Sequence, residues 1–134
     1  MQTNYTKNGN IRNVFLMNNG VEIGYFSVKC DKLGEDCDMN ISIDETYQGQ
    51  GLARYMIGVL VQNWYREDPQ IRKDKLIFID ADASAGFWDK IGMIDNRYSS
   101  NRQTKLSHLE GKGYEKVITF SKLARWALGH PLGS

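Results

Sequence analysis

Apolar and polar residues alternate with a period of two in three early segments of the chain, at residues 11–17, 21–29 and 37–43. This period is typical of β-strands that bury one face. Asn19 and Gly20 separate the first two segments and form a dipeptide that is typical of a tight hairpin turn. We therefore expect three antiparallel strands in the first third of the chain.

A helical pattern follows the third strand, at residues 51–66, and a short apolar run, LIFI, follows at residues 76–79. In the first of these segments apolar residues recur at the spacing of one helix face: Leu52, Met56, Val59, Leu60 and Trp64. The continuous apolar run is typical of a parallel strand that is buried on both faces. Together with the strand before the helix, these segments predict a β-α-β unit.

The remaining segments predict a second short helix, a loop and a final strand. The helix is expected at residues 85–91, where Gly92 stops it. Residues 99–113 are polar and predict a long loop, whereas residues 114–120 have the composition of a last strand. One or two helical turns are expected at residues 122–128.

The length of 134 residues predicts a single domain, and we expect a disordered tail at 129–134. Seventeen basic residues against sixteen acidic ones give almost no net charge, so the sequence predicts no general electrostatic attraction to nucleic acid or to a membrane surface. No apolar run is long enough to span a membrane, and the polar start is unlike a signal peptide. These features predict a cytoplasmic domain.

Two cysteines, Cys30 and Cys37, flank an acidic loop and could face each other across a hairpin. We expect both to be buried free thiols, because a chain with so few cysteines fits a reducing compartment. A metal site is not expected, since His108 and His130 lie far from the cysteines in the sequence.

The turn at residues 48–53, QGQGLA, joins the third strand to the long helix. The first turn of a helix has about four backbone N–H groups without intrahelical partners, and the helix dipole adds positive charge there. Glycine lets the backbone approach a ligand closely, so this turn could bind a phosphate or pyrophosphate. The alternative is an ordinary glycine-rich loop that opens a core helix.

Two motifs resemble those of the GNAT superfamily of acetyl-CoA-dependent N-acetyltransferases. Motif A of that family, Q/R-x-x-G-x-G/A, matches Gln48, Gly51 and Ala53. Motif B, roughly A-x-x-F-Y-x-K-x-G-F, is similar to AGFWDKIGM at residues 85–93. The resemblance covers about residues 11–121, which would form the core of the single domain. It implies an α/β (α+β) fold with a mixed sheet, in which antiparallel strands precede a β-α-β-α unit and C-terminal strands.

The front of the chain departs from this family. GNAT domains usually carry a first strand and two helices ahead of the hairpin, whereas only ten residues precede residue 11 here. The comparison implies a reduced N-terminal helical region. The acceptor site would then be open, or a partner chain would complete it, as in a homodimer.

The resemblance also implies cofactor contacts. The backbone of the third strand would hold the pantetheine arm of acetyl-CoA, the turn would bind the pyrophosphate, and aromatic residues of the second helix would flank the arm. The implied residues are Ile41, Ser42 and Ile43, then Gln48, Gly49, Gln50, Gly51, Leu52, Ala53 and Arg54, and finally Phe87 and Trp88. The structural alternatives are a plain core strand, a solvated arginine and core aromatics.

The general base is harder to assign. Many GNAT enzymes have a glutamate eleven residues before the first motif position, and here that residue is Cys37. We choose the adjacent Asp38 as the candidate base. Four other acids remain open as alternatives: Glu35, Asp36, Asp80 and Asp82.

The general acid also departs from the family pattern. Many members have a tyrosine four residues before the motif B glycine, where this chain has Trp88. An indole N–H can donate a hydrogen bond but supplies no proton at neutral pH. Tyr98, Tyr114 or water could serve instead, or the thiolate could leave unassisted.

The implied reaction is transfer of an acetyl group from acetyl-CoA to a primary amine on a small molecule or a protein. Residues 29–45 carry two lysines against six acidic residues, which favours a cationic acceptor such as a polyamine, a lysine or an amino sugar. A second hypothesis is a catalytically weak acyl-CoA-binding or interaction module. A third is a phosphate- or nucleotide-binding domain, which the absence of a Walker lysine argues against.

Overall fold

The computed structural model describes residues 1–30, 37–79, 85–95 and 116–131 of the chain. Its strands are β1 (Gln2–Asn8), β2 (Ile11–Asn18), β3 (Val21–Cys30), β4 (Cys37–Ile43), β5 (Leu76–Ile79), β6 (Ile94–Asp95) and β7 (Lys116–Thr119). Its helices are the 3₁₀ helix η1 (Glu45–Tyr47) and the α-helices α1 (Leu52–Glu67), α2 (Ala85–Ile91) and α4 (Phe120–Leu128).

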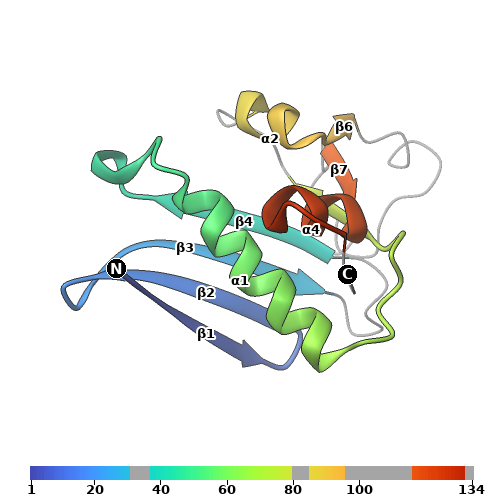
Figure 1. Cartoon of the computed structure of the whole chain (residues 1–134), viewed down its shortest axis with the longest axis horizontal. Coiled ribbons are helices and arrows are strands. Elements are labelled where there is room, and N and C mark those ends of the chain that lie inside the picture. Colours follow the sequence, from blue (N-terminus) through green and yellow to red (C-terminus); the bar gives the residue numbers. More distant parts are fainter. Residues whose placement is uncertain (31–36, 80–84, 96–115, 132–134) are drawn as a thin grey trace, which may run out of the picture.

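The described strands form one mixed sheet in the order β1-β2-β3-β4-β5-β7-β6. The strands from β1 to β4 are antiparallel neighbours, β5 runs parallel to β4, and β7 runs antiparallel to both β5 and β6. The predicted mixed sheet with its antiparallel front is confirmed. Helix α1 lies across the sheet and α4 lies beside α1 (Figure 1).

The Asn19–Gly20 hairpin is confirmed. Asn18 pairs with Val21, so the loop has two residues, and both have positive φ angles, 52° for Asn19 and 80° for Gly20. A two-residue turn of this kind requires left-handed backbone at both positions, which asparagine and glycine tolerate best.

Strand β1 was not predicted, so four antiparallel strands precede the glycine turn rather than three. It pairs with the whole of β2, from Gln2 opposite Met17 to Asn8 opposite Ile11. Its sequence, QTNYTKN, is polar because β1 is an edge strand whose residues are mostly exposed. An edge strand needs few apolar residues, and the alternation is therefore weak.

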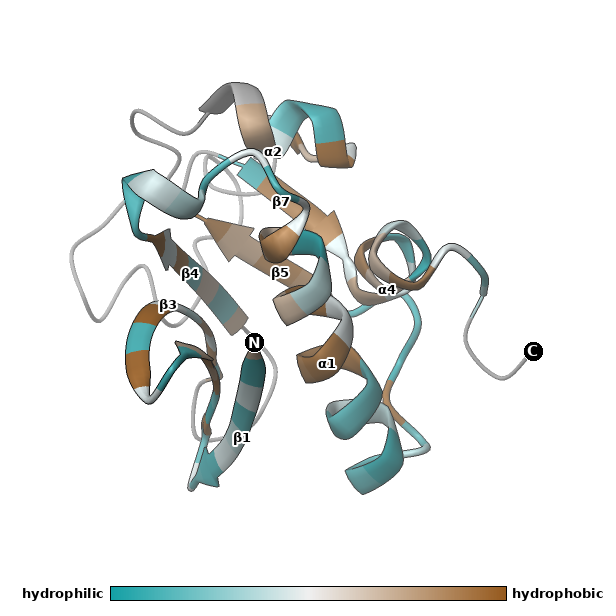
Figure 2. Cartoon of the chain, turned by 60° about the vertical axis from the view of Figure 1, so that its left-hand side comes forward, coloured by the Kyte–Doolittle hydropathy of each residue, from teal (hydrophilic) through white to brown (hydrophobic). Residues whose placement is uncertain are grey.

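The core lies between the sheet and the helices α1, α2 and α4. Its fully buried members come from every layer and include Leu16, Phe26, Ile57, Leu60, Ile77, Trp88, Phe120 and Leu123. Helix α1 buries an apolar face, as predicted, which includes Met56, Leu60 and Trp64. The C-terminal end of the helix is hydrophilic (Figure 2).

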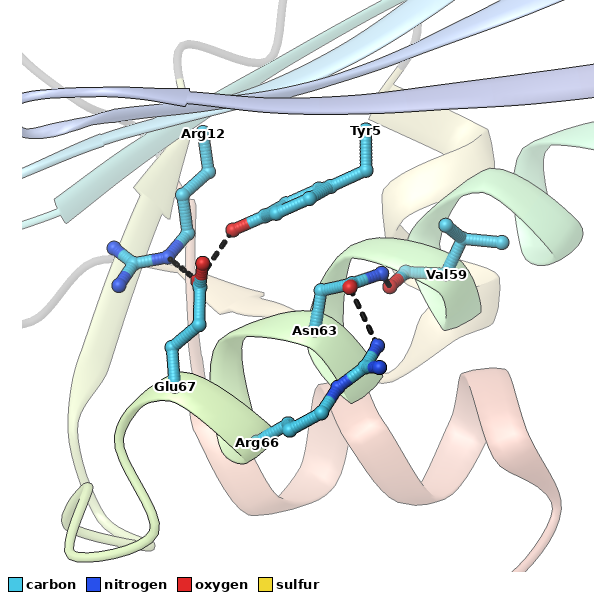
Figure 3. A network of polar contacts seen from close by, with 6 residues as sticks. All are labelled: Tyr5, Arg12, Val59, Asn63, Arg66 and Glu67. Atoms are coloured by element: carbon cyan, nitrogen blue, oxygen red, sulfur yellow. Dashed lines mark hydrogen bonds and ion pairs between the residues drawn. The ribbon is translucent and has the colours of Figure 1, made fainter.

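A polar network ties the C-terminal end of α1 to the first two strands (Figure 3). Tyr5 on β1 donates a hydrogen bond of 2.6 Å to Glu67 Oε1, and Arg12 Nε on β2 lies 3.4 Å from the same oxygen. The Arg12 guanidinium also lies 4.8 Å from the ring centroid of Trp64. Arg12 is only 8% exposed, so these two contacts compensate the burial of its charge.

The cysteine prediction was wrong in one respect. Cys30 and Cys37 do face each other across the β3–β4 ladder, but they are joined by a disulfide bond and are not free thiols. The two residues occupy directly opposite positions of neighbouring strands, which brings their side chains together. Because disulfides persist mainly in oxidising environments, the argument for a reducing compartment no longer holds.

The C-terminal elements differ in extent from the prediction. The last strand is Lys116–Thr119, and Phe120 already belongs to helix α4, which is longer than one or two turns at 122–128. Thr119 caps this helix by accepting a hydrogen bond of 3.3 Å from the Lys122 backbone N–H. Strand β6 was not predicted.

Several predictions concern residues outside the described part of the chain. They are the loop at 99–113, the end of the tail at 132–134, and the candidate acids Glu35, Asp36, Asp80, Asp82, Tyr98 and Tyr114. Among the described residues, no helix is long and apolar enough to span a membrane.

Candidate functional site

On its β5 side, strand β4 is paired along only part of its length by described residues. The two strands pair only at Cys37 with Ile77 and at Asp38 with Phe78. Strand β4 then continues along β3 to Ile43, and in the described part of the chain no strand pairs with its other edge beyond Asp38. The N–H and C=O groups of this edge could therefore bind an extended ligand.

The glycine turn follows directly and is tied back to the strand. The Gln48 side chain donates a hydrogen bond of 2.9 Å to the Ile43 carbonyl. Gly49 and Gly51 have φ angles of 81° and 75°, in the left-handed region that favours glycine. A Cβ built on either residue would meet no atom within 4 Å, so both glycines face open space.

Helix α1 begins at Leu52 without a side-chain cap. Gly51 is its N-cap residue, and the first backbone bond within the helix runs from Tyr55 N–H to the Gly51 carbonyl. The N–H groups of Leu52, Ala53 and Arg54 therefore have no partner within the helix. This helix end offers the donors and the positive potential that an anion requires.

A cavity of about 570 Å³ joins the β4 edge to the glycine turn. Its walls come from the end of β4, from the turn and first residues of α1, and from one aromatic residue each of α2 and α4. The lining residues are Ile41, Ser42, Ile43, Tyr47, Gln48, Gly49, Gly51, Leu52, Ala53, Arg54, Phe87 and Trp126.

Arg54 and Trp126 connect α1 to α4 at the cavity wall. Arg54 Nε donates a hydrogen bond of 2.9 Å to the Trp126 carbonyl, and the guanidinium carbon lies 5.3 Å from the Trp126 ring centroid. Phe87 meets the same indole edge to face, with 6.2 Å between the ring centroids. This wall of the cavity therefore combines aromatic rings with the Arg54 cation.

Most of the predicted cofactor residues line this cavity together. Gln50 and Trp88 are the exceptions: Gln50 is exposed on the turn, and Trp88 is completely buried in the core. Sequence reasoning missed Tyr47 and Trp126. The Tyr47 hydroxyl accepts a hydrogen bond of 2.9 Å from Asn18 Nδ2, which fixes the turn to the β2–β3 hairpin.

Asp38, the candidate base, is not among the lining residues. It lies opposite Lys29 on β3 and beside Phe78 on β5, at the last pair that joins β4 to β5. Its neighbours Cys37 and Met39 point into the core, so the Asp38 side chain lies on the opposite face of the sheet. One carboxylate oxygen, Oδ1, is buried and accepts no hydrogen bond from a described residue, although the residue has other interaction partners.

A metal centre is not found among the described residues, which contain no group of three histidine, cysteine or carboxylate side chains in suitable positions. The only ionisable side chains on the described cavity wall are those of Tyr47 and Arg54.

No protein-family model and no curated protein matches the sequence. Solved structures do match. An acetyltransferase of the GNAT family from Streptococcus pneumoniae is 17% identical with a TM-score of 0.50, and the match covers 66% of this chain and 55% of that protein. Tetrahymena GCN5 is 10% identical with a TM-score of 0.54, over 84% of this chain and 70% of its own.

A third match is the spermidine/spermine N-acetyltransferase of Vibrio cholerae, which is 14% identical with a TM-score of 0.51, over 85% of this chain and 69% of its own. The chain thus spans little more than half of the Streptococcus pneumoniae protein and about two thirds of the other two. These likenesses show that the chain has the fold of the GNAT acetyltransferases, and the predicted fold is confirmed.

Proposed function

We propose that this chain transfers an acetyl group from acetyl-CoA to a primary amine. The observation that carries the proposal is the cavity that joins two features: the stretch of β4 beyond Asp38, which no described strand pairs with on its β5 side, and the glycine turn before α1. An extended arm that ends in a pyrophosphate needs these two surfaces side by side, and the chain has them within the fold of an acetyltransferase.

The glycine turn has the properties of a pyrophosphate site. Gly49 and Gly51 leave open the space that side chains would occupy, and the N–H groups at the start of α1 are available to phosphate oxygens. The backbone from Ile41 to Ile43 would hold the pantetheine arm, and Phe87 would contact the arm from α2.

When bound, acetyl-CoA supplies an activated acetyl thioester. The nitrogen of the neutral acceptor attacks the carbonyl carbon, so that a C–N bond forms and the C–S bond breaks. The amine loses one proton to a base, and the departing thiolate takes one proton from an acid or from water. Backbone N–H groups of β4 beyond Asp38 would stabilise the charge that develops on the carbonyl oxygen.

Asp38 is the proposed base for that proton. It stands where β4 and β5 separate and on the sheet face opposite α1, so an acceptor could approach it without crossing the donor cavity. An Asp38→Asn variant should lose turnover at neutral pH and keep its affinity for acetyl-CoA, because asparagine preserves size but has no basicity. A pH–rate profile that overlays the parent at every pH would contradict this role.

The acceptor is proposed to be cationic. Three described acidic residues of the segment 29–45 lie on β4 or just after it: Asp38, Asp44 and Glu45. Asp44 and Glu45 are exposed. Carboxylates around a site attract cationic acceptors and repel acidic ones. A polyamine, a lysine side chain and an amino sugar all satisfy this condition.

A catalytically weak acyl-CoA-binding module is the second candidate. The described cavity wall favours this candidate because it has no carboxylate or histidine that could act as a base. Trp88 also favours it, because this residue is buried at the position where many GNAT enzymes have the tyrosine that serves as the general acid. Such a module would bind the thioester without turning it over.

Acetyl-CoA-dependent thiol release with a panel of amines separates the two functions. The panel would contain spermidine, a lysine peptide, glucosamine and an acidic amine as a matched control. Release with a cationic amine supports the proposed transferase. Binding of acetyl-CoA without release on any amine supports the binding module, and binding of ATP instead would refute both.

A further inference from the structure

The two edges of the described sheet differ in how they are protected. One edge is β6, which has only two residues. The other is β1, which pairs with β2 along all seven of its residues without a bulge and lies outermost in the sheet (Figure 1). Short strands, bulges, prolines and charges are the usual devices that keep a sheet edge from pairing with another chain. Strand β1 has none of the first three, and its only charged residue is Lys7.

The turn after β1 determines which of its backbone groups face outward. Asn8 pairs with Ile11 across a two-residue turn that starts with Gly9, whose φ is 60°. The pair that closes such a hairpin is hydrogen-bonded, and hydrogen-bonded and non-hydrogen-bonded pairs then alternate along the strands. The even-numbered residues of β1 therefore bond to β2. The outward-facing N–H and C=O groups belong to the odd-numbered residues: Thr3, Tyr5 and Lys7.

These outward-facing groups are complementary to those of a second copy of the strand. Tyr5 is the middle residue of β1, so a two-fold axis there would place two copies antiparallel over their whole length. Tyr5 would then lie opposite Tyr5 of the other copy, and Thr3 opposite Lys7. Each of these residues would exchange both backbone hydrogen bonds with its partner, and the two lysines would not meet.

The side chains of β1 suit the same arrangement. The Tyr5 hydroxyl donates a hydrogen bond of 2.6 Å to Glu67 on α1, so the centre of the strand is fixed on the sheet before a partner binds. On the opposite face of the strand, Asn4 and Thr6 are exposed and uncharged. Asn4 of one copy would lie directly opposite Thr6 of the other, so no like charges oppose the contact.

We propose that this chain forms a symmetric dimer through β1, in which the sheets of two copies join into one continuous sheet. Strands β2 and β3 separate β1 from β4, so the donor cavity of each copy stays open. The dimer therefore does not depend on the proposed function, and the loss of either leaves the other intact.

Cysteine cross-linking tests the register of the two strands. Asn4→Cys and Thr6→Cys place thiols at directly opposite positions across the axis, where Cα atoms are about 4.5 Å apart and a disulfide can form. A mixture of the two variants should give a covalent dimer under mild oxidation. Neither variant alone should do so, because equal positions of the two copies would be about 7–8 Å apart. The natural cysteines are already bonded to each other and do not interfere.

The dissociation constant of the dimer, measured by sedimentation equilibrium, tests the contact in a second way. Asn4→Glu with Thr6→Lys would place opposite charges across the axis, and Asn4→Lys with Thr6→Lys would place like charges there. Each pair occurs twice in the dimer, so the first variant should bind about tenfold more tightly than the parent and the second about tenfold more weakly. The matched control is Gln62→Lys with Gln70→Lys, which adds the same charge at exposed positions away from β1 and should dimerise as the parent does.

Three results would overturn the proposal. The first is a parent protein that stays monomeric at the highest concentration at which it is soluble. The second is cross-linking of Asn4→Cys or Thr6→Cys alone as readily as of the mixture, which would place the strands in another register. The third is equal dissociation constants for the two charged variants, which would place the contact away from β1. A dimer that tightens with opposite charges and weakens with like charges supports the proposal.

Discussion

Glu67 should contribute more to stability than an exposed ion-pair partner such as Asp74, because its own partner Arg12 is buried. Breaking a fully buried ion pair by removing one partner costs about 3–5 kcal/mol. The Arg12 side chain is 10% exposed, but that of Glu67 is 34% exposed, so water can replace part of the lost interaction. Trp64 also keeps its contact with the guanidinium. For Glu67→Ala we therefore expect a loss of about 2 kcal/mol.

Urea denaturation followed by circular dichroism measures this loss. With a slope of about 2 kcal/mol per molar urea, the midpoint should fall by about 1 M. Glu67→Gln should lose roughly half as much, because its side-chain oxygen can still accept hydrogen bonds from Tyr5 and Arg12.

The matched control is the pair Arg72–Asp74, whose N–O distance of 2.9 Å is shorter than the 3.4 Å of Arg12–Glu67. Its side chains are 80% and 68% exposed. If burial decides the energy, Asp74→Asn should not shift the midpoint measurably, despite the shorter distance. Equal shifts for Glu67→Ala and Asp74→Asn would refute the reasoning.

Three further predictions follow from particular contacts. Replacing both Cys30 and Cys37 by alanine should cost about 2.5 kcal/mol, the loop-closure value for a sequence separation of 7, and a reducing agent should lower the denaturation midpoint of the parent but not of this variant. Burial and the hydrogen bond to Glu67 raise the pKa of Tyr5 from 10.0 to about 12. The stability that the protonated Tyr5 hydroxyl contributes is therefore complete below pH 10 and is lost as the pH rises through 12. Tyr5→Phe should flatten this fall in stability, and an equal fall in parent and variant would contradict the prediction. Gly58→Ala should raise the free energy of unfolding by about 0.5–1 kcal/mol, because the new Cβ would lie at an ordinary contact distance of 3.5 Å from Leu128 Cδ2. A loss of stability would show that the contact between α1 and α4 is too tight for a methyl group.

The strand, turn and helix around Gln48 could be predicted because each element has a strong local signal. Alternation defined β4, glycine defined the turn, and one apolar face defined α1. The contact between Gln48 and the Ile43 carbonyl lies within the same segment, so the geometry of the turn follows from neighbouring residues. Local order of this kind is what a sequence pattern reports.

Other features depend on contacts between distant segments and have no local signal. Trp126 belongs to a helix whose pattern predicts only a buried face, and its place at the cavity wall arises from packing against Arg54 and Phe87. The disulfide depends on the β3–β4 register, which places Cys30 directly opposite Cys37. Strand β1 could not be predicted because Tyr5 is its only apolar residue, so its sequence shows no alternation of apolar and polar positions.

Calorimetric titration of acetyl-CoA into the parent protein and into Gly51→Asp tests the central claim most directly. Gly51 has a φ of 75° and faces open space at the start of α1, so an aspartate there would place a carboxylate where the pyrophosphate is proposed to bind. Aspartate tolerates left-handed backbone better than most residues, and the variant should remain folded. We expect the parent to bind acetyl-CoA and the variant to bind it at least tenfold more weakly, the effect of about 1.4 kcal/mol of lost interaction. Equal affinities in two folded proteins would contradict the proposed site.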